Sequence, residues 1–374
     1  MAATVFDASL LDRAPMGVRT ARDAAGALGG FTDLDSPAIC VPDGTRYLDL
    51  VSALTALGER LPNRGPVVIG LGLHRPMTAE ALAPLAAFGP IQHDPDDVVP
   101  TRTVAGIPGT VSRHVAEAPY AIAVGVVELH QYAGVSGGHK AVAVGCGGRA
   151  TIAALHHRDR VLAPGVEIGR VAGNPFREAV DALGEAAGCR LALVWVPAVG
   201  LWMFGPPDQV VRTALEHMQP WQMCPVAAPG AVLEVTAEKG ISLYQASRAA
   251  TYLALSPRPP LSDGATLVIR APCPDGLGAE EGFVRALTSQ RPPWGGLLDG
   301  EPPTGAGAQR AVILALMARR YRLEVEGCVD PEVFMAVGIE ARADCRRYPP
   351  TWLHVDRPFQ QIPQLAGPQA TDGG

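Results

Sequence analysis

The chain has 374 residues, of which 48% are hydrophobic and 18% are charged, and its formal net charge at pH 7 is −6. This composition is typical of a globular protein of about two domains with a large core, and it excludes an intrinsically disordered chain. The acidic balance also argues against nucleic acid as a partner, because proteins that bind nucleic acid normally present a basic surface.

Lysine is scarce in this chain. Among the 31 cationic side chains only Lys140 and Lys239 are lysines. A drift toward GC-rich codons explains the excess of arginine. Each remaining lysine is nevertheless a candidate for chemistry that arginine cannot perform, such as formation of a covalent acyl or imine bond.

The cysteines and the N-terminal segment bear on the cellular compartment. The seven cysteines include no CxxC pair, as expected of free thiols in a reducing compartment. The N-terminal residues lack the basic and apolar regions of a signal peptide, and the chain has no run of about 18 apolar residues. We therefore expect a cytoplasmic protein with no membrane partner.

Short apolar runs alternate with helix-like segments along the chain. In the first part we predict strands at residues 38–41, 67–71, 121–127 and 191–196, and helices at 47–60, 78–87, 150–157, 175–187 and 209–217. In the second part we predict strands at 231–235, 265–271 and near 323–325, and helices at 243–255 and 307–320. This alternation predicts an α/β fold with a larger N-terminal domain on a mainly parallel sheet and a smaller C-terminal α/β domain.

Composition also suggests the domain boundaries. The segment at 219–230 is rich in proline and follows a predicted helix, so it is the candidate linker. The predicted divisions are an N-terminal domain at 1–218, a C-terminal domain at 231–363 and a disordered tail at 364–374.

Polar side chains follow three of the predicted strands. The first strand is followed by Asp43 and Arg46, the second by His74, and the third by Glu128 and His130. Each group alone is more simply explained as a turn or a surface side chain. The carboxyl ends of parallel strands lie on one edge of the sheet, where ligands bind, so these side chains could converge on one site.

A glycine-rich loop at residues 134–140 follows His130 and ends in Lys140. Its glycines would allow backbone N–H groups to approach a phosphate closely. The segment is not a P-loop, because it lacks the Gly-Lys pair and the following Ser or Thr. A plain turn is the commoner explanation of such a loop, and the presence of Lys140 favours the functional one.

Two further segments carry candidate ligands. His156 ends a predicted helix, but one histidine alone makes a poor metal site, so a metal there would need donors from a cofactor. In the second domain, Tyr244 and Arg248 are spaced to share a helical face beside Gln245, a combination that suits a carboxylate. An ordinary amphipathic helix explains that segment equally well.

The two histidines at strand ends admit one specific mechanism. Inversion of a stereocentre requires an acid or base on each face of the substrate, and histidine titrates near neutral pH. His74 and His130 are therefore candidates for such a pair.

These segments resemble, in order along the chain, the motifs of the nickel-pincer-dependent lactate racemase family of 2-hydroxyacid racemases and epimerases. The SGGHK sequence that ends at Lys140, with histidines before and after it, is the most specific of them. The matching segments are DGTR at 43–46, GLGLHRPMT at 70–78, His93-Asp94, ELHQYAGVSGGHK at 128–140, and SLYQASR at 242–248.

The resemblance implies a role for each of these residues. Lys140 would hold the nickel-pincer nucleotide through a thioamide, and His156 would complete the coordination of its nickel. His74 and His130 would be the two bases, one removing the substrate hydroxyl proton while a hydride leaves C2 and a 2-oxo acid forms. The remaining contacts would be made to the cofactor by Asp43, Thr45, Ser136, Gly137 and Gly138, and to the substrate by Arg46, Tyr244, Gln245 and Arg248.

The resemblance also implies a site in the cleft between two α/β domains, a small 2-hydroxy acid as substrate, and cofactor-building enzymes as partners. The chain departs from the family pattern at Arg248, where the family has lysine, and at residues 305–315, which lack the expected tryptophan. Two alternatives remain open. One is a C2 epimerase of a sugar acid with the same cofactor, and the other is a non-catalytic descendant that binds the nucleotide or nickel.

Overall fold

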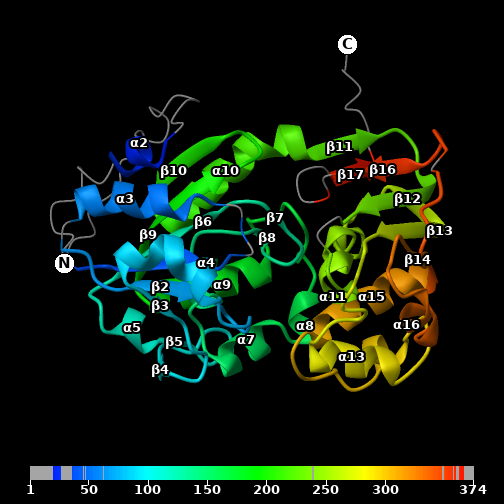
Figure 1. Cartoon of the computed structure of the whole chain (residues 1–374), viewed down its shortest axis with the longest axis horizontal. Coiled ribbons are helices and arrows are strands. Elements are labelled where there is room, and N and C mark those ends of the chain that lie inside the picture. Colours follow the sequence, from blue (N-terminus) through cyan, green and yellow to red (C-terminus); the bar gives the residue numbers. More distant parts are fainter. Residues whose placement is uncertain are drawn as a thin grey trace, which may run out of the picture. The chain divides into compact units, whose positions relative to one another are not determined.

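The computed structural model describes residues 20–26 and 36–365, apart from residues 45, 47, 62, 238, 239, 348, 357 and 359–361. The chain divides into two compact units. The first unit contains residues up to His156 and residues 163–219, and the second contains residues 157–162 and the chain from Pro220 onward. Each unit has its own sheet, mainly parallel in the first unit and parallel in the second (Figure 1).

The first unit is built on a six-stranded sheet with the order β10-β9-β6-β1-β2-β3. All neighbouring strands are parallel except β9 and β10, which form an antiparallel pair at one edge. The central strands are buried on both faces and are therefore continuous apolar runs. The strands are β1 (Ala38–Pro42), β2 (Val67–Gly70), β3 (Pro90–Gln92), β6 (Ala121–Val126), β9 (Cys189–Val196) and β10 (Leu201–Gly205).

Helices cover both faces of this sheet. On one face, α2 (Ala21–Ala25) and α3 (Leu50–Arg60) contribute to a buried cluster in which Leu54 and Leu57 join apolar side chains of the strands. On the other face α9 (Pro175–Ala186) packs against β9 (Figure 1). Beside α9 lies α6 (Lys140–Ala143), which contacts β6 and β1. The first turn of α9 is fixed by Asn174, whose side chain accepts hydrogen bonds from two backbone N–H groups of the helix.

The remaining elements of the first unit are short, apart from α10. They are α4 (Ala79–Leu82), the 3₁₀-helix η2 (Ala83–Phe88), α5 (Arg113–Ala116), α7 (Arg149–Leu155), α10 (Pro207–Gln222), and two antiparallel ribbons, β4 (Val98–Pro100) with β5 (Thr110–Ser112) and β7 (Leu129–His130) with β8 (Gly134–Val135).

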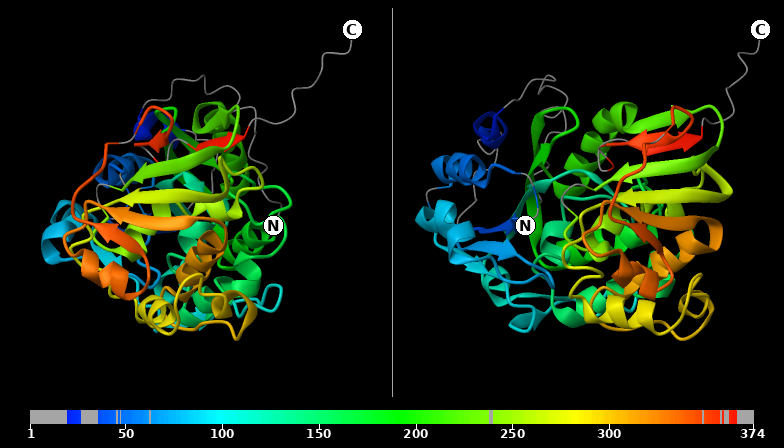
Figure 2. Two further views of the ribbon diagram at one scale, coloured as in Figure 1. Left: turned by 90° about the vertical axis from the view of Figure 1, so that its right-hand side faces the viewer. Right: turned by 45° about the vertical axis from the view of Figure 1, so that its right-hand side comes forward.

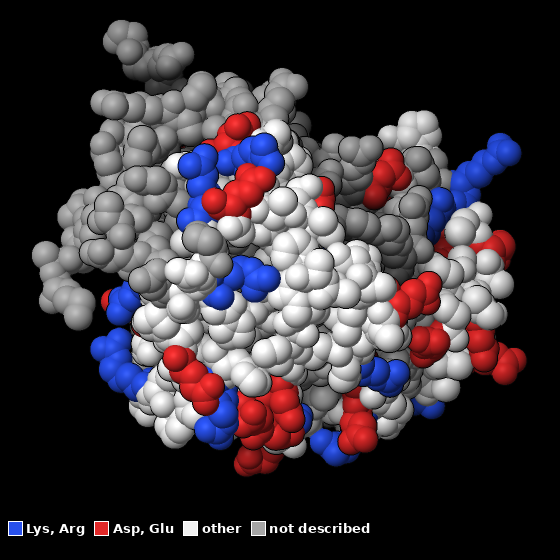
Figure 3. Space-filling model, turned by 60° about the vertical axis from the view of Figure 1, so that its left-hand side comes forward, with Lys and Arg blue, Asp and Glu red and all other residues white. Residues whose placement is uncertain are grey.

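Acidic and basic side chains are interspersed on the face that Figure 3 shows, around a largely uncharged centre.

The second unit is built on a five-stranded sheet with the order β15-β14-β13-β12-β16, in which all neighbours are parallel (Figure 2). The strands are β12 (Gly230–Thr236), β13 (Leu261–Arg270), β14 (Arg322–Glu326), β15 (Glu340–Arg342) and β16 (Leu353–Val355). Helix α15 (Ala308–Arg320) packs against β13 and β14 and carries the main apolar surface of this unit. Beside α15 lie α8 (Arg158–Val161), α12 (Tyr252–Leu255), α13 (Glu281–Thr288) and α14 (Gly296–Asp299).

The other elements of the second unit are α11 (Leu243–Ala246), the 3₁₀-helix η3 (Ser247–Ala249), α16 (Pro331–Ala336), and the parallel pair β11 (Met223–Val226) with β17 (Ile362–Leu365). Within the described ranges, every helix is too short or too polar to span a lipid bilayer.

The predicted α/β class with a mainly parallel sheet is confirmed, and each predicted strand is present with shifted ends. The single helix predicted at residues 243–255 is wrong, because the structure has α11, η3 and α12 there. The predicted helix at 78–87 is α4 continued by η2. Side-chain hydroxyls explain the break in the first case, since Ser247 and Thr251 donate hydrogen bonds to backbone carbonyls one turn earlier.

The predicted linker at 219–230 contains regular elements, since α10 continues to Gln222 and β11 follows directly. The two units divide at the start of this segment, between Gln219 and Pro220. Gln364 and Leu365 belong to β17, where they pair with β11, while residues 366–374 of the predicted tail lie outside the described residues. The pairing of β11 with β17 thus places part of the predicted linker and the first two residues of the predicted tail in regular structure.

Candidate active site

The predicted site residues of the first unit lie at the carboxyl ends of β1, β2 and β6. These three strands are neighbours in the order β6-β1-β2, so their ends share one edge of the sheet. Asp43 follows β1, His74 follows β2, and Glu128 follows β6. The structure therefore brings together side chains that are separated by up to 85 positions between Asp43 and Glu128.

Asp43 and His74 are directly hydrogen-bonded. His74 Nδ1 lies 2.6 Å from Asp43 Oδ2, and the carboxylate is largely buried while the imidazole side chain is 60% exposed. An ionised carboxylate can only accept, so the proton of this hydrogen bond belongs to His74 Nδ1. The histidine is thus oriented by a buried carboxylate and presents its other side to the surface.

Arg46 is held by a second carboxylate at the same edge. Its Nη1 donates to Glu128 Oε2 over 3.0 Å, and both side chains are about four-fifths buried. This pair joins the segment after β1 to the segment after β6. Thr45, which was predicted to contact the cofactor, lies outside the described residues.

His130 lies in the short ribbon of β7 and β8. Its Nδ1 accepts hydrogen bonds from the backbone N–H groups of Tyr132 at 3.2 Å and Ala133 at 3.1 Å. The turn closes at Gly134, where φ is +72° and a Cβ would lie 2.0 Å from the carbonyl oxygen of Arg170. Only glycine fits there, and the ring of His130 is consequently oriented by main-chain groups.

The glycine loop after β8 has a fixed conformation. The Ser136 hydroxyl donates to the carbonyl of Val126 and accepts from the N–H of Glu128, so this side chain ties the loop to the end of β6. Gly137 and Gly138 both have positive φ, and a Cβ at either would lie less than 3.0 Å from a neighbouring atom. Within the described part of the chain, the N–H groups of these two glycines donate no hydrogen bond.

Lys140 begins α6 at the end of this loop. The preceding residue, His139, belongs to a buried cluster of ionic side chains. His139 Nδ1 lies 3.0 Å from Asp181 Oδ1, and Arg177 donates to both oxygens of the same carboxylate at 2.9 and 2.7 Å. Burial alone would raise the pKa of Asp181, but the hydrogen bonds and charges of His139 and Arg177 outweigh it and lower that pKa. The residue next to Lys140 is therefore anchored by a desolvated ion pair.

The segment after α6 also contacts the loop that carries His74. The N–H of Gly72 donates to the carbonyl of Gly145, and a Cβ on Gly70 would lie 3.0 Å from the Gly145 backbone. His93, which was matched to a family motif, is buried and contacts Gly147 O through Nε2 at 2.9 Å. Burial lowers the pKa of His93, consistent with a neutral ring that holds this backbone in place.

His156 follows α7 and has one ring nitrogen engaged by its own helix. Nδ1 lies 2.9 Å from the carbonyl oxygen of Ile152, which can only accept, so Nδ1 carries the proton and Nε2 keeps the lone pair. The ring packs edge-on against Tyr132 and Phe176. A ligating histidine typically has this arrangement, with its second nitrogen donating to a carbonyl.

The described residues around His156 do not by themselves form a metal site. Among the described residues there is no group of three or more His, Cys, Asp or Glu side chains that could hold a metal ion. A metal at His156 would therefore need most of its donors from a bound molecule.

The predicted substrate residues of the second unit lie on α11 and η3. Ser242 caps α11, and the Tyr244 ring packs edge-on against Phe283 with the guanidinium of Arg310 over it at 5.1 Å. Gln245 is exposed, and Arg248 is half-buried in η3. Because they belong to the second unit, their positions relative to His74 and Lys140 remain predictions.

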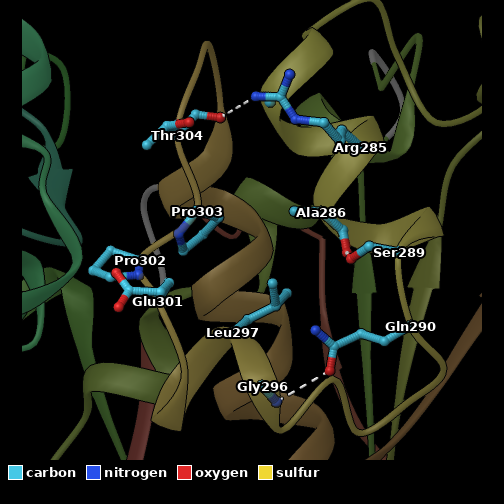
Figure 4. Close-up of a pocket in the computed structure, with 11 residues that line it drawn as sticks. Arg285, Ala286, Ser289, Gln290, Gly296, Leu297, Glu301, Pro302, Pro303 and Thr304 are labelled. Atoms are coloured by element: carbon cyan, nitrogen blue, oxygen red, sulfur yellow. Dashed lines mark hydrogen bonds between the residues drawn. The ribbon is translucent and has the colours of Figure 1, made fainter.

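A pocket of about 290 Å³ also lies in the second unit, beside α13 and α14 (Figure 4). Arg285 donates to the carbonyl of Thr304 across it, and Gln290 accepts from the N–H of Gly296. None of the predicted site residues is among the described residues that line it.

Part of the sequence and the fold are similar to known proteins. Residues 31–169 match the family model of the lactate racemase N-terminal domain. None of the curated proteins matches the chain by sequence. The fold is similar to that of the lactate racemase apoprotein from Thermoanaerobacterium thermosaccharolyticum, with a TM-score of 0.80 and 18% identity over 92% of this chain and 93% of the other.

A protein from Thermotoga maritima is also similar, with a TM-score of 0.68 and 14% identity over 92% of this chain and 97% of that one. Residues 31–169 are thus similar to the lactate racemase N-terminal domain, and the fold is lactate racemase-like, as the motif resemblance predicted.

Several residues of this site were not among the predicted ones. Glu128 was noticed at a strand end and as the first residue of a matched motif but was given no role, and the structure shows its contact with Arg46. Asp181 and Arg177 lie on α9, where their spacing of four residues indicates an ordinary helical ion pair. No sequence signal links Asp181 to His139, which is 42 positions away.

Proposed function

We propose that this protein is a racemase or epimerase that inverts C2 of a 2-hydroxy acid with a nickel-pincer nucleotide attached to Lys140. The observation that carries the proposal is the pairing of His74 with buried Asp43 on the same sheet edge as Arg46, Glu128 and the Lys140 loop. The match of residues 31–169 to the lactate racemase N-terminal domain supports it.

The residues present fit the proposed cofactor. Gly137 and Gly138 offer two N–H groups without an acceptor in the described part of the chain, which suits an anionic oxygen. Lys140 supplies the amine for a covalent bond, and His156 supplies a nitrogen lone pair at Nε2. A nickel ion at His156 would take its other donors from the nucleotide.

When bound, the nucleotide would supply a group that accepts a hydride from C2 of the substrate and returns it. The chain's own residues then have to bind the acid and move the hydroxyl proton. Arg46 has a guanidinium suited to a carboxylate, and Glu128 holds it in one orientation. His74, with Nδ1 bonded to Asp43, has Nε2 as its basic atom.

The proposal is tested with protein made together with the cofactor-building enzymes. We expect a mass adduct on Lys140, nickel in stoichiometric amount, and interconversion of the enantiomers or epimers of at least one acid in a panel of 2-hydroxy acids. The matched control is Lys140→Arg, which keeps the charge but cannot form the covalent bond.

A Lys140→Arg protein that still carries the adduct and nickel would contradict the proposal. Loaded wild-type protein that turns over no 2-hydroxy acid would favour a binding role instead. Deuterated solvent gives a further check on the chemistry, because internal return of a hydride keeps the original hydrogen at C2. Its replacement by deuterium would indicate simple proton abstraction at carbon.

A further inference from the structure

The buried side chain of Asn174 joins two segments that flank His156. The chain has only two asparagines, Asn63 and Asn174, and Asn174 is completely buried. It caps α9, because its Oδ1 accepts hydrogen bonds from the N–H groups of Phe176 at 3.0 Å and Arg177 at 3.1 Å. Aspartate and serine cap helices equally well, so capping alone gives no reason for an amide at this position.

The amide nitrogen of Asn174 has its own partners. Nδ2 donates to the carbonyl oxygens of Tyr132 at 2.8 Å and Arg170 at 2.9 Å. A side-chain amide has two N–H donors and an oxygen with two lone pairs, and here all four are engaged. One buried side chain thus holds the main chain of Tyr132, between β7 and β8, next to the first turn of α9.

The two segments that Asn174 joins carry the aromatic rings beside His156. The Tyr132 ring lies edge-on to the His156 ring with 6.0 Å between centroids, and Phe176 lies edge-on to it at 5.4 Å. Tyr132 and Phe176 also contact each other at 5.5 Å, and each is only 2% exposed. The three rings therefore form one packed group, and Asn174 ties together the main chains of two of its members.

The orientation of the His156 ring depends on these neighbours. Its Nδ1 donates to the carbonyl oxygen of Ile152 at 2.9 Å, which fixes the position of one ring nitrogen. A single hydrogen bond to a carbonyl still allows the ring to tilt, because the angular preference of the acceptor is broad. The favourable edge-on contacts with Tyr132 and Phe176 restrict that tilt. The direction of Nε2 is therefore set jointly by one hydrogen bond and two buried rings.

We propose that Asn174 is a positioning residue for the nickel ligand His156. It acts through the rings of Tyr132 and Phe176, whose main chains it clamps together. This inference rests on the proposed function, in which Nε2 of His156 binds the nickel of the nucleotide. Groups that orient a metal-binding histidine matter for affinity, and their loss typically weakens metal binding about 10–100-fold.

Two substitutions separate this role from helix capping. Asn174→Ser keeps an oxygen that can cap α9 but has no amide to reach the carbonyls of Tyr132 and Arg170, whereas Asn174→Ala loses both functions. The matched control is Asp49→Ala, which removes the N-cap of α3, where the side chain accepts from the N–H of Ser52 at 3.0 Å. This control loses a helix cap in the same unit without touching the rings beside His156.

The orientation of the His156 ring can be measured in the protein without cofactor. Carbon–proton spectra of histidine-labelled protein resolve the ring signals, because the chain has only nine histidines, and His156→Ala assigns the signal of His156. Ring currents of Tyr132 and Phe176 shift this signal away from that of an exposed histidine. We expect Asn174→Ser and Asn174→Ala to move it toward the exposed value, and Asp49→Ala to leave it unchanged.

Nickel retention in the loaded protein tests the consequence. The protein is made together with the cofactor-building enzymes and exposed to excess EDTA, and both the released nickel and the mass of the adduct on Lys140 are followed. We expect Asn174→Ser to lose nickel about tenfold faster than wild type with the adduct retained, and Asp49→Ala to match wild type. His156→Ala should lose nickel at least as fast as Asn174→Ser.

A double variant shows whether Asn174 acts through His156. If it does, adding Asn174→Ser to His156→Ala should not raise the rate of nickel loss further, because the ring that Asn174 orients is already absent. A further increase of similar size in the double variant would contradict the inference. So would an Asn174→Ser protein that matches Asp49→Ala in either the spectra or the nickel loss.

The proposed function and this inference fail in different ways. If loaded wild-type protein carries no nickel, or if His156→Ala retains it as wild type does, the proposed role of His156 as a ligand fails and the inference fails with it. If His156→Ala loses nickel and Asn174→Ser does not, the proposed function stands and the inference alone fails. Thermal unfolding of each variant confirms that the comparison is made between folded proteins.

Discussion

Both units bury ionic side chains, but in different places relative to the sheet. In the first unit, Arg177, Asp181 and His139 lie under the glycine loop that ends in Lys140, and the Arg177 side chain is only 1% exposed. The cluster contains one helical ion pair and one contact from the loop. The buried cluster thus fixes the loop segment of the proposed site that ends in Lys140.

In the second unit the buried charges lie across the strands of the sheet. Glu234 on β12 and Glu326 on β14 are both fully buried, and Arg270 on the strand between them lies 2.8 and 3.5 Å from them. His354 on β16 contacts Glu234 at 2.8 Å, and Arg346 contacts Glu326. This cluster includes none of the predicted site residues and joins neighbouring strands to one another.

The pKa shifts of the two clusters have opposite directions. The pKa of Asp181 is lowered, because His139 and Arg177 outweigh burial. The pKa of Glu234 is raised, because burial outweighs Arg270 and His354. Ionisation of Asp181 therefore favours folding of the first unit at neutral pH, whereas ionisation of Glu234 opposes folding of the second unit.

The largest expected effect is that of Arg177→Met. It leaves Asp181 buried without its guanidinium partner, which should lower the free energy of unfolding by about 3–5 kcal/mol. Urea unfolding measures the change. The matched control is Arg113→Met, because Arg113 pairs with Asp97 at the surface and should cost about 1 kcal/mol or less. Equal losses in the two variants would remove the distinction between buried and exposed pairs.

Asp181→Asn is expected to have an intermediate effect, about 2–3 kcal/mol at neutral pH. Because the folded-state pKa of Asp181 is lowered, its stabilisation is complete above the usual carboxyl value of 3.8 and is lost as pH falls through the folded-state value. The difference between wild type and Asp181→Asn should therefore shrink in acid. Urea unfolding at a series of pH values measures it, and a constant difference would contradict the assigned direction.

The smallest effect should be that of Glu234→Gln, within about 1 kcal/mol at neutral pH. The folded-state pKa of Glu234 is raised above 4.5, so its contribution is favourable in acid and is lost as pH rises through the folded-state value. Relative to wild type, the variant should gain stability between acid and neutral pH, opposite to Asp181→Asn. The same unfolding series decides this sign.

The sequence predicted those parts of the fold and site that depend on local pattern. The strands that precede Asp43, His74 and Glu128 were found because buried parallel strands are continuous apolar runs. Because these residues follow strands, they were expected at one edge of the sheet. There His74 contacts Asp43 and Arg46 contacts Glu128.

Features that depend on distant contacts could not be predicted in this way. The contact of His139 with Asp181 requires α9 to pack under the loop, and the pairing of β11 with β17 joins segments far apart in the chain. The orientation of the His130 ring is a different case. Its partners are only two and three residues away, but their direction depends on the backbone angles of the turn.

The contact between Gly72 and Gly145 joins two loops of the site through their main chains. Because both contacting residues are glycines, the distance between the His74 loop and the segment after Lys140 does not depend on a side chain at this contact. Substitutions at exposed Leu73, which is 37% exposed beside His74, can therefore vary the surface offered to a substrate while the separation of the two loops is retained. For engineering substrate preference, Leu73 is consequently a safer position to diversify than Gly72 or Gly145.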